Sequence, residues 1–187
     1  MRKYLFRILM AVIVFSLVGC QQHAATTVNQ NVEEDIDGFI EPEPSDWMKY
    51  NKIVMTYMYY RTQAVINNDI HLLWNQYPDL KGDYDLQKGI NVEKDEVESL
   101  NKGFKLIDAN YSIESRDRMK VKVITDEEVI VLVHGGIGYL RNDYIESGGE
   151  LLTEISLKVK NGRWTVVKTD EYTEPEYKEW LKKKNKQ

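Results

Sequence analysis

The sequence DWMKYNKIVMTYMYYRTQAV at residues 46–65 predicts a long helix, and the rest of the chain is placed around it. Bulky side chains recur there at spacings of three and four residues, which is the period of one helix face. Ser45 is in position to cap the first turn, and Asn67-Asn68-Asp69 ends the helix. Aromatic residues at this spacing belong to a core more often than to a ligand cage. We therefore expect one face to be buried, comprising Trp47, Tyr50, Val54, Tyr57, Met58, Arg61, Ala64 and Val65.

Two further helices are expected before the chain changes its pattern. Residues 70–77 form a short helix that Pro78 stops, and Asn91 caps a third helix that runs to residue 100. The early turns of the third helix are acidic, which the helix dipole favours, with Glu93, Asp95, Glu96 and Glu98. A calcium site is conceivable, but the order of these residues does not follow the EF-hand pattern. We interpret them as a solvated acidic face.

After Gly103 the apolar residues alternate with a period of two, which predicts strands. Asn161-Gly162 is the strongest hairpin signal in the chain. Successive strands that are linked by hairpins favour an antiparallel sheet, here of four to five strands. Thr173 and Glu176 form a capping box that opens a terminal helix. The predicted fold class is α+β, with N-terminal helices packed on a curved antiparallel sheet and a C-terminal helix.

This order of elements resembles a known family. A long helix, an Asn-Asp break, a short helix ending at Tyr77-Pro78 and a meander of long strands are similar to the nuclear-transport-factor-2-like, or cystatin-like, α+β cone. The resemblance covers residues 46–172 and implies a sheet curled around the long helix, with a pocket at its open end. Some members are isomerases or cyclases in which an Asp or a His transfers a proton, many bind ligands, and many dimerise through the sheet. The fold alone therefore leaves the function open.

The strand register predicts a pocket mouth. A two-residue turn at Asn161-Gly162 places Thr153 opposite Asp170 and Ile155 opposite Lys168. Lys168, Asp170 and Thr153 then line the mouth, with Tyr139 beside them. An Asp beside a Lys in a partly apolar pocket is a candidate general base. The alternative, which we favour, is a salt bridge at the end of a strand.

The same register assigns the neighbouring side chains to faces of the sheet. Trp164 shares a face with Leu157 and Val166, so we expect it to be buried against the long helix near Tyr57 or Met58. His134 pairs with Ser156 on the outer face, which favours a half-exposed side chain over a catalytic one. The three histidines of the chain follow no ligand spacing, which argues against zinc. We predict no catalytic residue, no metal and no cofactor.

The N-terminus carries an export signal. Arg2, Lys3 and Arg7 precede an apolar stretch at residues 8–18, which is too short to span a membrane. The stretch ends in Leu17-Val18-Gly19-Cys20, which resembles the lipobox of bacterial lipoproteins. The resemblance implies that Cys20 receives a diacylglyceryl group and becomes the mature N-terminus. An ordinary secretory peptide with a coincidental cysteine and an uncleaved signal anchor are the alternatives.

These signals divide the chain into a signal peptide at 1–19, a disordered acidic tether at 20–45 and a single α+β domain at 46–187. Residues 1–19 hold three basic side chains and no acidic one, so the rest of the chain has 22 basic and 30 acidic side chains, a net charge of −8. Such a surface repels nucleic acid. The single cysteine excludes an intramolecular disulfide.

The sequence therefore predicts a membrane-anchored extracytoplasmic lipoprotein. Its anchor on Cys20 would hold it at the outer face of the cytoplasmic membrane, or at the outer membrane of a cell that has two. The domain is expected to bind a small ligand or a partner protein without catalysis. An isomerase- or cyclase-type enzyme that uses a pocket Asp or His is the alternative. A homodimer through the outer sheet face, which carries Val167 and His134, is a third possibility.

Overall fold

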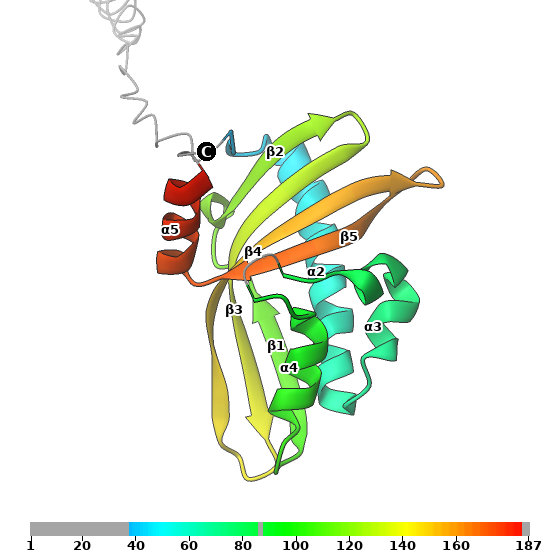
Figure 1. Cartoon of the computed structure of the whole chain (residues 1–187), viewed down its shortest axis with the longest axis vertical. Helices are drawn as coiled ribbons and strands as arrows, with labels where there is room; N and C mark the ends of the chain where they lie inside the picture. Colours follow the sequence, from blue (N-terminus) through cyan, green and yellow to red (C-terminus); the bar gives the residue numbers. More distant parts are fainter. Residues whose placement is uncertain (1–37, 86–87, 185–187) are drawn as a thin grey trace, which may run out of the picture. The chain divides into compact units, whose positions relative to one another are not determined.

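The computed structural model describes residues 38–85 and 88–184; the expected signal peptide and Cys20 lie outside these residues. Helices come first, then a five-stranded antiparallel sheet, then a terminal helix, which confirms the predicted α+β class (Figure 1). The helices are α2 (Pro44–Asn67), α3 (His71–Gln76), the 3₁₀ helix η1 (Pro78–Gly82), α4 (Val92–Leu100), the 3₁₀ helix η2 (Arg116–Arg118) and α5 (Glu174–Lys184). The strands are β1 (Leu106–Ser112), β2 (Met119–Thr125), β3 (Glu128–Arg141), β4 (Glu146–Lys160) and β5 (Arg163–Tyr172).

Helix α2 begins one residue before the expected cap. Pro44 occupies its first turn, where the missing N–H and the fixed φ of proline suit a helix start. Glu43 is the N-cap and makes no side-chain capping bond, so the prediction that Ser45 caps the helix is wrong. The helix ends at Asn68, which is in the left-handed conformation and donates its N–H to carbonyls of the last turn. The expected core face is confirmed, since all of its residues except the half-buried Trp47 are buried.

The sheet is organised around the long strand β3. Its order is β1-β3-β4-β5, and β2 also pairs with β3. Strand β2 lies along the first half of β3, where Met119 is opposite Val133, and β1 lies along the second half, where Ser112 is opposite Gly136. At the predicted hairpin, Asn161 and Gly162 both have positive φ, at 52° and 73°, as a tight two-residue turn requires.

The two faces of the sheet bury different clusters. The inner face packs on α2 and holds the main core, which includes Tyr57, Met58, Val131, Ile155 and Leu157. The outer face holds a smaller cluster of Phe39, Leu132, Tyr172 and Tyr177, the last of which comes from α5. Figure 1 shows the strands between α5 on one side and α2, α3 and α4 on the other. The sheet is therefore covered on both sides in its middle part.

Residues that we expected in the tether also pack on the domain. Phe39 is 4% exposed, and Ile40 forms a β-bridge with Val121. Arg116 donates to the carbonyl of Pro42 at 2.8 Å and lies near the carboxylate of Glu41. The packed part of the chain thus includes residues before position 46.

A β-bulge changes the predicted register of β5. The pairs Val159–Trp164 and Leu157–Val166 are as predicted, but the register shifts between Leu157 and Ser156. Val167 is the extra residue, so Ile155 lies opposite Thr169 instead of Lys168. Because side chains alternate between faces, one inserted residue exchanges the faces of all that follow. The predicted pairs of Lys168 and Asp170 are therefore wrong.

Trp164 packs on α2 at a different place from the one expected. It is half-buried, and its ring meets that of Tyr50 edge-on at 6.2 Å between centroids. The ammonium of Lys49 lies 5.3 Å from the centre of the Trp164 ring. The prediction of a buried Trp164 near Tyr57 or Met58 is wrong, because the contact lies about two helical turns nearer the start of α2.

Candidate functional site

The main polar feature of the interior is Arg61. Helix α2 carries it on the face that packs into the sheet, where only 2% of the residue is exposed. Its Nε donates to Oε2 of Glu96 at 2.6 Å, and its Nη1 is paired with Oε1 of Glu171. The two carboxylates come from α4 and β5, so this ion triad joins three elements.

The triad fixes the charge of its centre. Burial alone would lower the pKa of Arg61, but Glu171 and Glu96 outweigh that effect and raise it well above its ordinary value. A buried guanidinium needs such partners, because an uncompensated buried charge is costly. Arg61 therefore stays charged and holds both carboxylates in place.

Hydroxyl groups complete the network. Tyr139 donates to Oε1 of Glu96, and Tyr57 donates to Oε1 of the buried Glu93 at 2.8 Å. Thr169 donates to the same oxygen of Glu93. Burial first, and the adjacent glutamates second, raise the pKa values of Tyr57 and Tyr139, so both phenols remain neutral donors at ordinary pH.

A cleft of about 320 Å³ opens above this network. We call it the open-end cleft; it lies between α4 and the inner sides of β3, β4 and β5, with Arg61, Glu96, Tyr139 and Glu171 among its polar lining. Its other lining residues are Lys88, Ile90, Val92, Asp95, Ser99, Leu100, Ser147, Gly148 and Leu151. Its volume is at the lower end of the range for small-molecule sites. The cleft is thus both polar and large enough for a small ligand.

The predicted pocket mouth is divided by the structure. Tyr139 faces inward and lines the open-end cleft, and Thr153 is fully buried on the inner face, opposite Glu171. Lys168 and Asp170 form the ion pair that we favoured, but the bulge turns both to the outer face. The two pairs of residues therefore lie on opposite sides of the sheet.

His134 lies on the outer face, as predicted, although it is opposite Leu152 and not Ser156. Its Nε2 is 3.0 Å from Oε2 of Glu150, and its Nδ1 contacts the guanidinium of Arg118. The imidazole is therefore held in a surface polar cluster and does not reach the open-end cleft.

The sequence analysis missed Arg61, Glu96 and Glu171 as site residues. Arg61 had a usable signal, since it is the one charged residue on the predicted core face of the first helix. The interpretation of the α4 acids as a solvated face is wrong for Glu93 and Glu96, which point inward, and holds for Asp95 and Glu98, which are exposed. Glu171 reaches the inner face only because of the bulge.

Metal ligands and membrane-spanning helices can be assessed for residues 38–85 and 88–184. These residues contain no group of three or more His, Cys, Asp or Glu side chains placed to hold a metal ion. None of their helices has both the length and the apolar character needed to cross a membrane.

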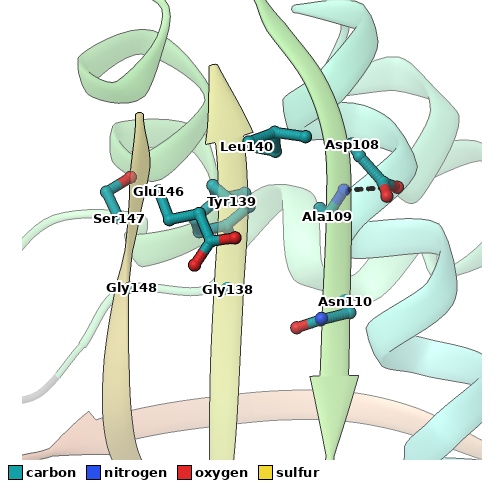
Figure 2. Close-up of a pocket in the computed structure, with 9 residues that line it drawn as sticks. All are labelled: Asp108, Ala109, Asn110, Gly138, Tyr139, Leu140, Glu146, Ser147 and Gly148. Atoms are coloured by element: carbon teal, nitrogen blue, oxygen red, sulfur yellow. Dashed lines mark hydrogen bonds between the residues drawn. The ribbon is translucent and has the colours of Figure 1, made fainter. Parts of the chain in front are cut away.

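A second hollow lies on the outer side of the sheet. This outer groove has a volume of about 480 Å³ and is formed by β1, β3 and β4 (Figure 2). Gly138 and Gly148 leave its floor without side chains, and Asn110, Glu146 and Asp108 stand at its sides (Figure 2). A Cβ atom at Gly148 would lie 2.1 Å from the carbonyl oxygen of Ile137, so this close pairing needs glycine.

Comparisons with known proteins identify the fold. No family model matches the chain, and no curated protein matches its sequence. The solved structure of Aln2 from a Streptomyces species is similar at 10% identity and a TM-score of 0.50, and the match covers 73% of this chain and 96% of that one. A nuclear transport factor 2 (NTF2-like) superfamily protein from Salmonella enterica serovar Typhimurium has 7% identity and a TM-score of 0.45, covering 70% and 92%. A hexachlorocyclohexane dehydrochlorinase LinA-type3 from Novosphingobium barchaimii has 9% identity and a TM-score of 0.46, covering 71% and 91%.

The element order and the likeness to Aln2 show the expected α+β fold of helices packed on an antiparallel sheet, and similar structures are described as NTF2-like and as having a cystatin-like fold. At identities this low the likeness concerns the fold only, so the function has to be argued from the site.

Proposed function

We propose that this chain is a lipid-anchored extracytoplasmic protein whose NTF2-like domain binds a small ligand or a partner without catalysis. The anchor is Cys20, which follows the lipobox-like Leu17-Val18-Gly19. Two acyl chains on one residue give stable attachment, because each buried methylene contributes about 0.8 kcal/mol. The domain then works at the outer face of a membrane.

The observation that carries the binding role is the engagement of the polar groups in the open-end cleft. Glu96 and Glu171 are both paired with Arg61, and Tyr139 donates to Glu96. A general base needs a side chain that is free to take a proton from a substrate. Groups held in this way are suited instead to fixing the orientation of a bound molecule.

The enzyme alternative rests on a pocket Asp or His, and the positions of these residues weigh against it. Asp170 and His134 both face the outer side of the sheet, away from the open-end cleft. An enzyme of this type would have to use Asp95, Glu96 or Glu171 of the open-end cleft in place of them.

Fractionation of cells tests the anchored role. The unaltered protein is expected in the membrane fraction, and its extraction should require detergent. Cys20→Ala should remain as a precursor without lipid, whereas Ser16→Ala in the same signal region should behave like the parent. The lipid anchor would be refuted if the Cys20→Ala protein still lost its signal peptide and its mature chain remained attached to the membrane as firmly as the unaltered protein. Conversion of a bound ligand into a different compound during incubation with the protein would refute the non-catalytic role.

A further inference from the structure

The charges around the open-end cleft are unequal. Three carboxylates line it, from Asp95, Glu96 and Glu171, against the two cations Arg61 and Lys88. The carboxylate of Glu93 is buried behind this wall, 1% exposed, and is held by hydroxyl groups instead of a cation. Walls of low dielectric focus the field of such a cleft. The excess of negative charge favours a ligand that carries a positive charge.

The floor of the cleft also offers an unused donor beside an unused acceptor. Arg61 uses Nε and Nη1, while its Nη2 has no hydrogen-bond partner among the residues that the structure describes. Glu171 uses Oε1, and within the same residues its Oε2 has none. This Nη2 is not among the buried polar atoms that lack a partner, so it is accessible from the cleft. A ligand with an acceptor next to a cationic group would satisfy both.

The remaining wall is apolar. Ile90, Leu100 and Leu151 line the cleft together with Val92. Leu100 and Leu151 are half-buried and pack at the edge of the main core, so they form a surface for an aliphatic group. The cleft therefore combines a negative site, one donor and an aliphatic wall within about 320 Å³.

We propose, on the basis of the binding function above, that the open-end cleft binds a small organic cation with a hydrogen-bond acceptor beside its ammonium group and an aliphatic side group, as in an α-amino amide. The ammonium group lies against Glu171 and Asp95. The acceptor receives the Nη2 hydrogen of Arg61. The aliphatic group packs on Leu100 and Leu151.

Calorimetric titration of the purified mature chain with matched probes tests this chemistry at about pH 6.5, where an α-amino group is protonated. L-leucinamide carries all three features. 3-Methylbutylamine lacks the acceptor, and 4-methylpentanamide lacks the cation. 4-Methylpentanoate also lacks the cation and carries a carboxylate in place of the amide. We expect saturable binding of leucinamide, with each of the other three at least tenfold weaker.

Variants connect the binding to the cleft. Glu171→Gln keeps the shape but removes a charge, and it should weaken leucinamide about tenfold while leaving 4-methylpentanamide unchanged. The matched control is Glu128→Gln, a half-buried glutamate that pairs with Lys158 on the outer face. If the Glu171→Gln protein does not fold, a second measurement on the unaltered chain tests the proposal. Leucinamide should there shift the NMR methyl signals of Leu100 and Leu151 and not that of Leu132, which lies on the outer face.

The outcomes separate this proposal from the binding function itself. Tighter binding of 4-methylpentanoate than of leucinamide would overturn the cationic class and leave a binding cleft. Absence of leucinamide binding would also overturn it. So would a loss of leucinamide affinity in Glu128→Gln that equals the loss in Glu171→Gln. Leucylglycinamide separates the sources of the chemistry, because stronger binding than leucinamide indicates a peptide N-terminus and weaker binding indicates a free amino-acid derivative.

Discussion

At the scale of single residues, Gly135 and Tyr111 share one position on the inner face. A Cβ atom on Gly135 would lie 2.3 Å from the hydroxyl oxygen of Tyr111 and 2.5 Å from the ring carbon that carries it. No heavy atom approaches the corresponding position of Gly149 on β4 within 4 Å. The glycine of β3 therefore makes room for a tyrosine ring from β1.

Gly135→Ala should accordingly lower the free energy of unfolding by about 1–3 kcal/mol, the usual cost of overpacking. Gly149→Ala is the control and should change it by less than about 0.5 kcal/mol. Urea unfolding of the unlipidated protein measures both. Equal midpoints for the two variants would show that Tyr111 does not occupy this space.

The ion triad gives a second prediction at this scale. Arg61→Met keeps an apolar stem but leaves Glu96 and Glu171 without their cation, and breaking a buried pair in this way costs about 3–5 kcal/mol. Lys160→Met, which breaks the exposed pair with Asp79, should cost less than about 1 kcal/mol. Denaturant midpoints decide between them. A small loss for Arg61→Met would mean that the triad is not a structural centre.

At the scale of elements, the period of the apolar residues predicts the strands, but the sequence does not reveal a local irregularity within one of them. The alternation of apolar residues and the Asn161-Gly162 turn predict the long hairpin of β4 and β5 correctly as far as Val166. The bulge at Val167 is a local shift of register, and no residue type in the strand marks it. For this reason Tyr139 and Thr153 were placed on the correct face, whereas Lys168 and Asp170 were not.

The terminal helix α5 has a capping box that responds to pH. The carboxylate of Glu176 accepts from the backbone N–H of Thr173 at 2.8 Å. In return, the hydroxyl oxygen of Thr173 accepts from the backbone N–H of Glu176 at 3.4 Å. The backbone and hydroxyl bonds from Thr173 lower the pKa of Glu176. A depressed carboxyl pKa contributes stability above the unfolded value, and this contribution is lost as pH falls through the folded value.

Acidification below about pH 4.5 should therefore loosen the first turn of α5. Hydrogen exchange of the α5 amides should accelerate there in the parent, relative to the intrinsic rate, while Glu176→Ala should show fast exchange already at neutral pH. Glu179→Ala on the same helix should retain the behaviour of the parent. An unchanged exchange pattern in Glu176→Ala would contradict the role of the capping box.

At the scale of the whole molecule, the start of the folded part is testable. Residues 39–42 pack on β2 and η2, although composition placed them in the tether. Polar and acidic residues with prolines do not reveal that a single phenylalanine among them is buried. A chain that starts at Gly38 should be more stable than one that starts at Asp46, because it retains the burial of Phe39, which contributes about 1.5–3 kcal/mol.

Thermal and urea unfolding of the two truncated chains measure this difference. Phe39→Ala should lower the stability of the longer chain toward that of the shorter one, whereas Glu43→Ala should change it much less. Identical stabilities of the long and short chains would return the boundary to residue 46.

We propose an NTF2-like domain on a lipid anchor at Cys20, and the intact mass of the protein isolated from its membrane tests this proposal most directly. The account predicts a chain that begins at Cys20 and carries a diacylglyceryl group, with Cys20→Ala remaining at the mass of the precursor. An unlipidated mature chain, or one cut at another position, would contradict it.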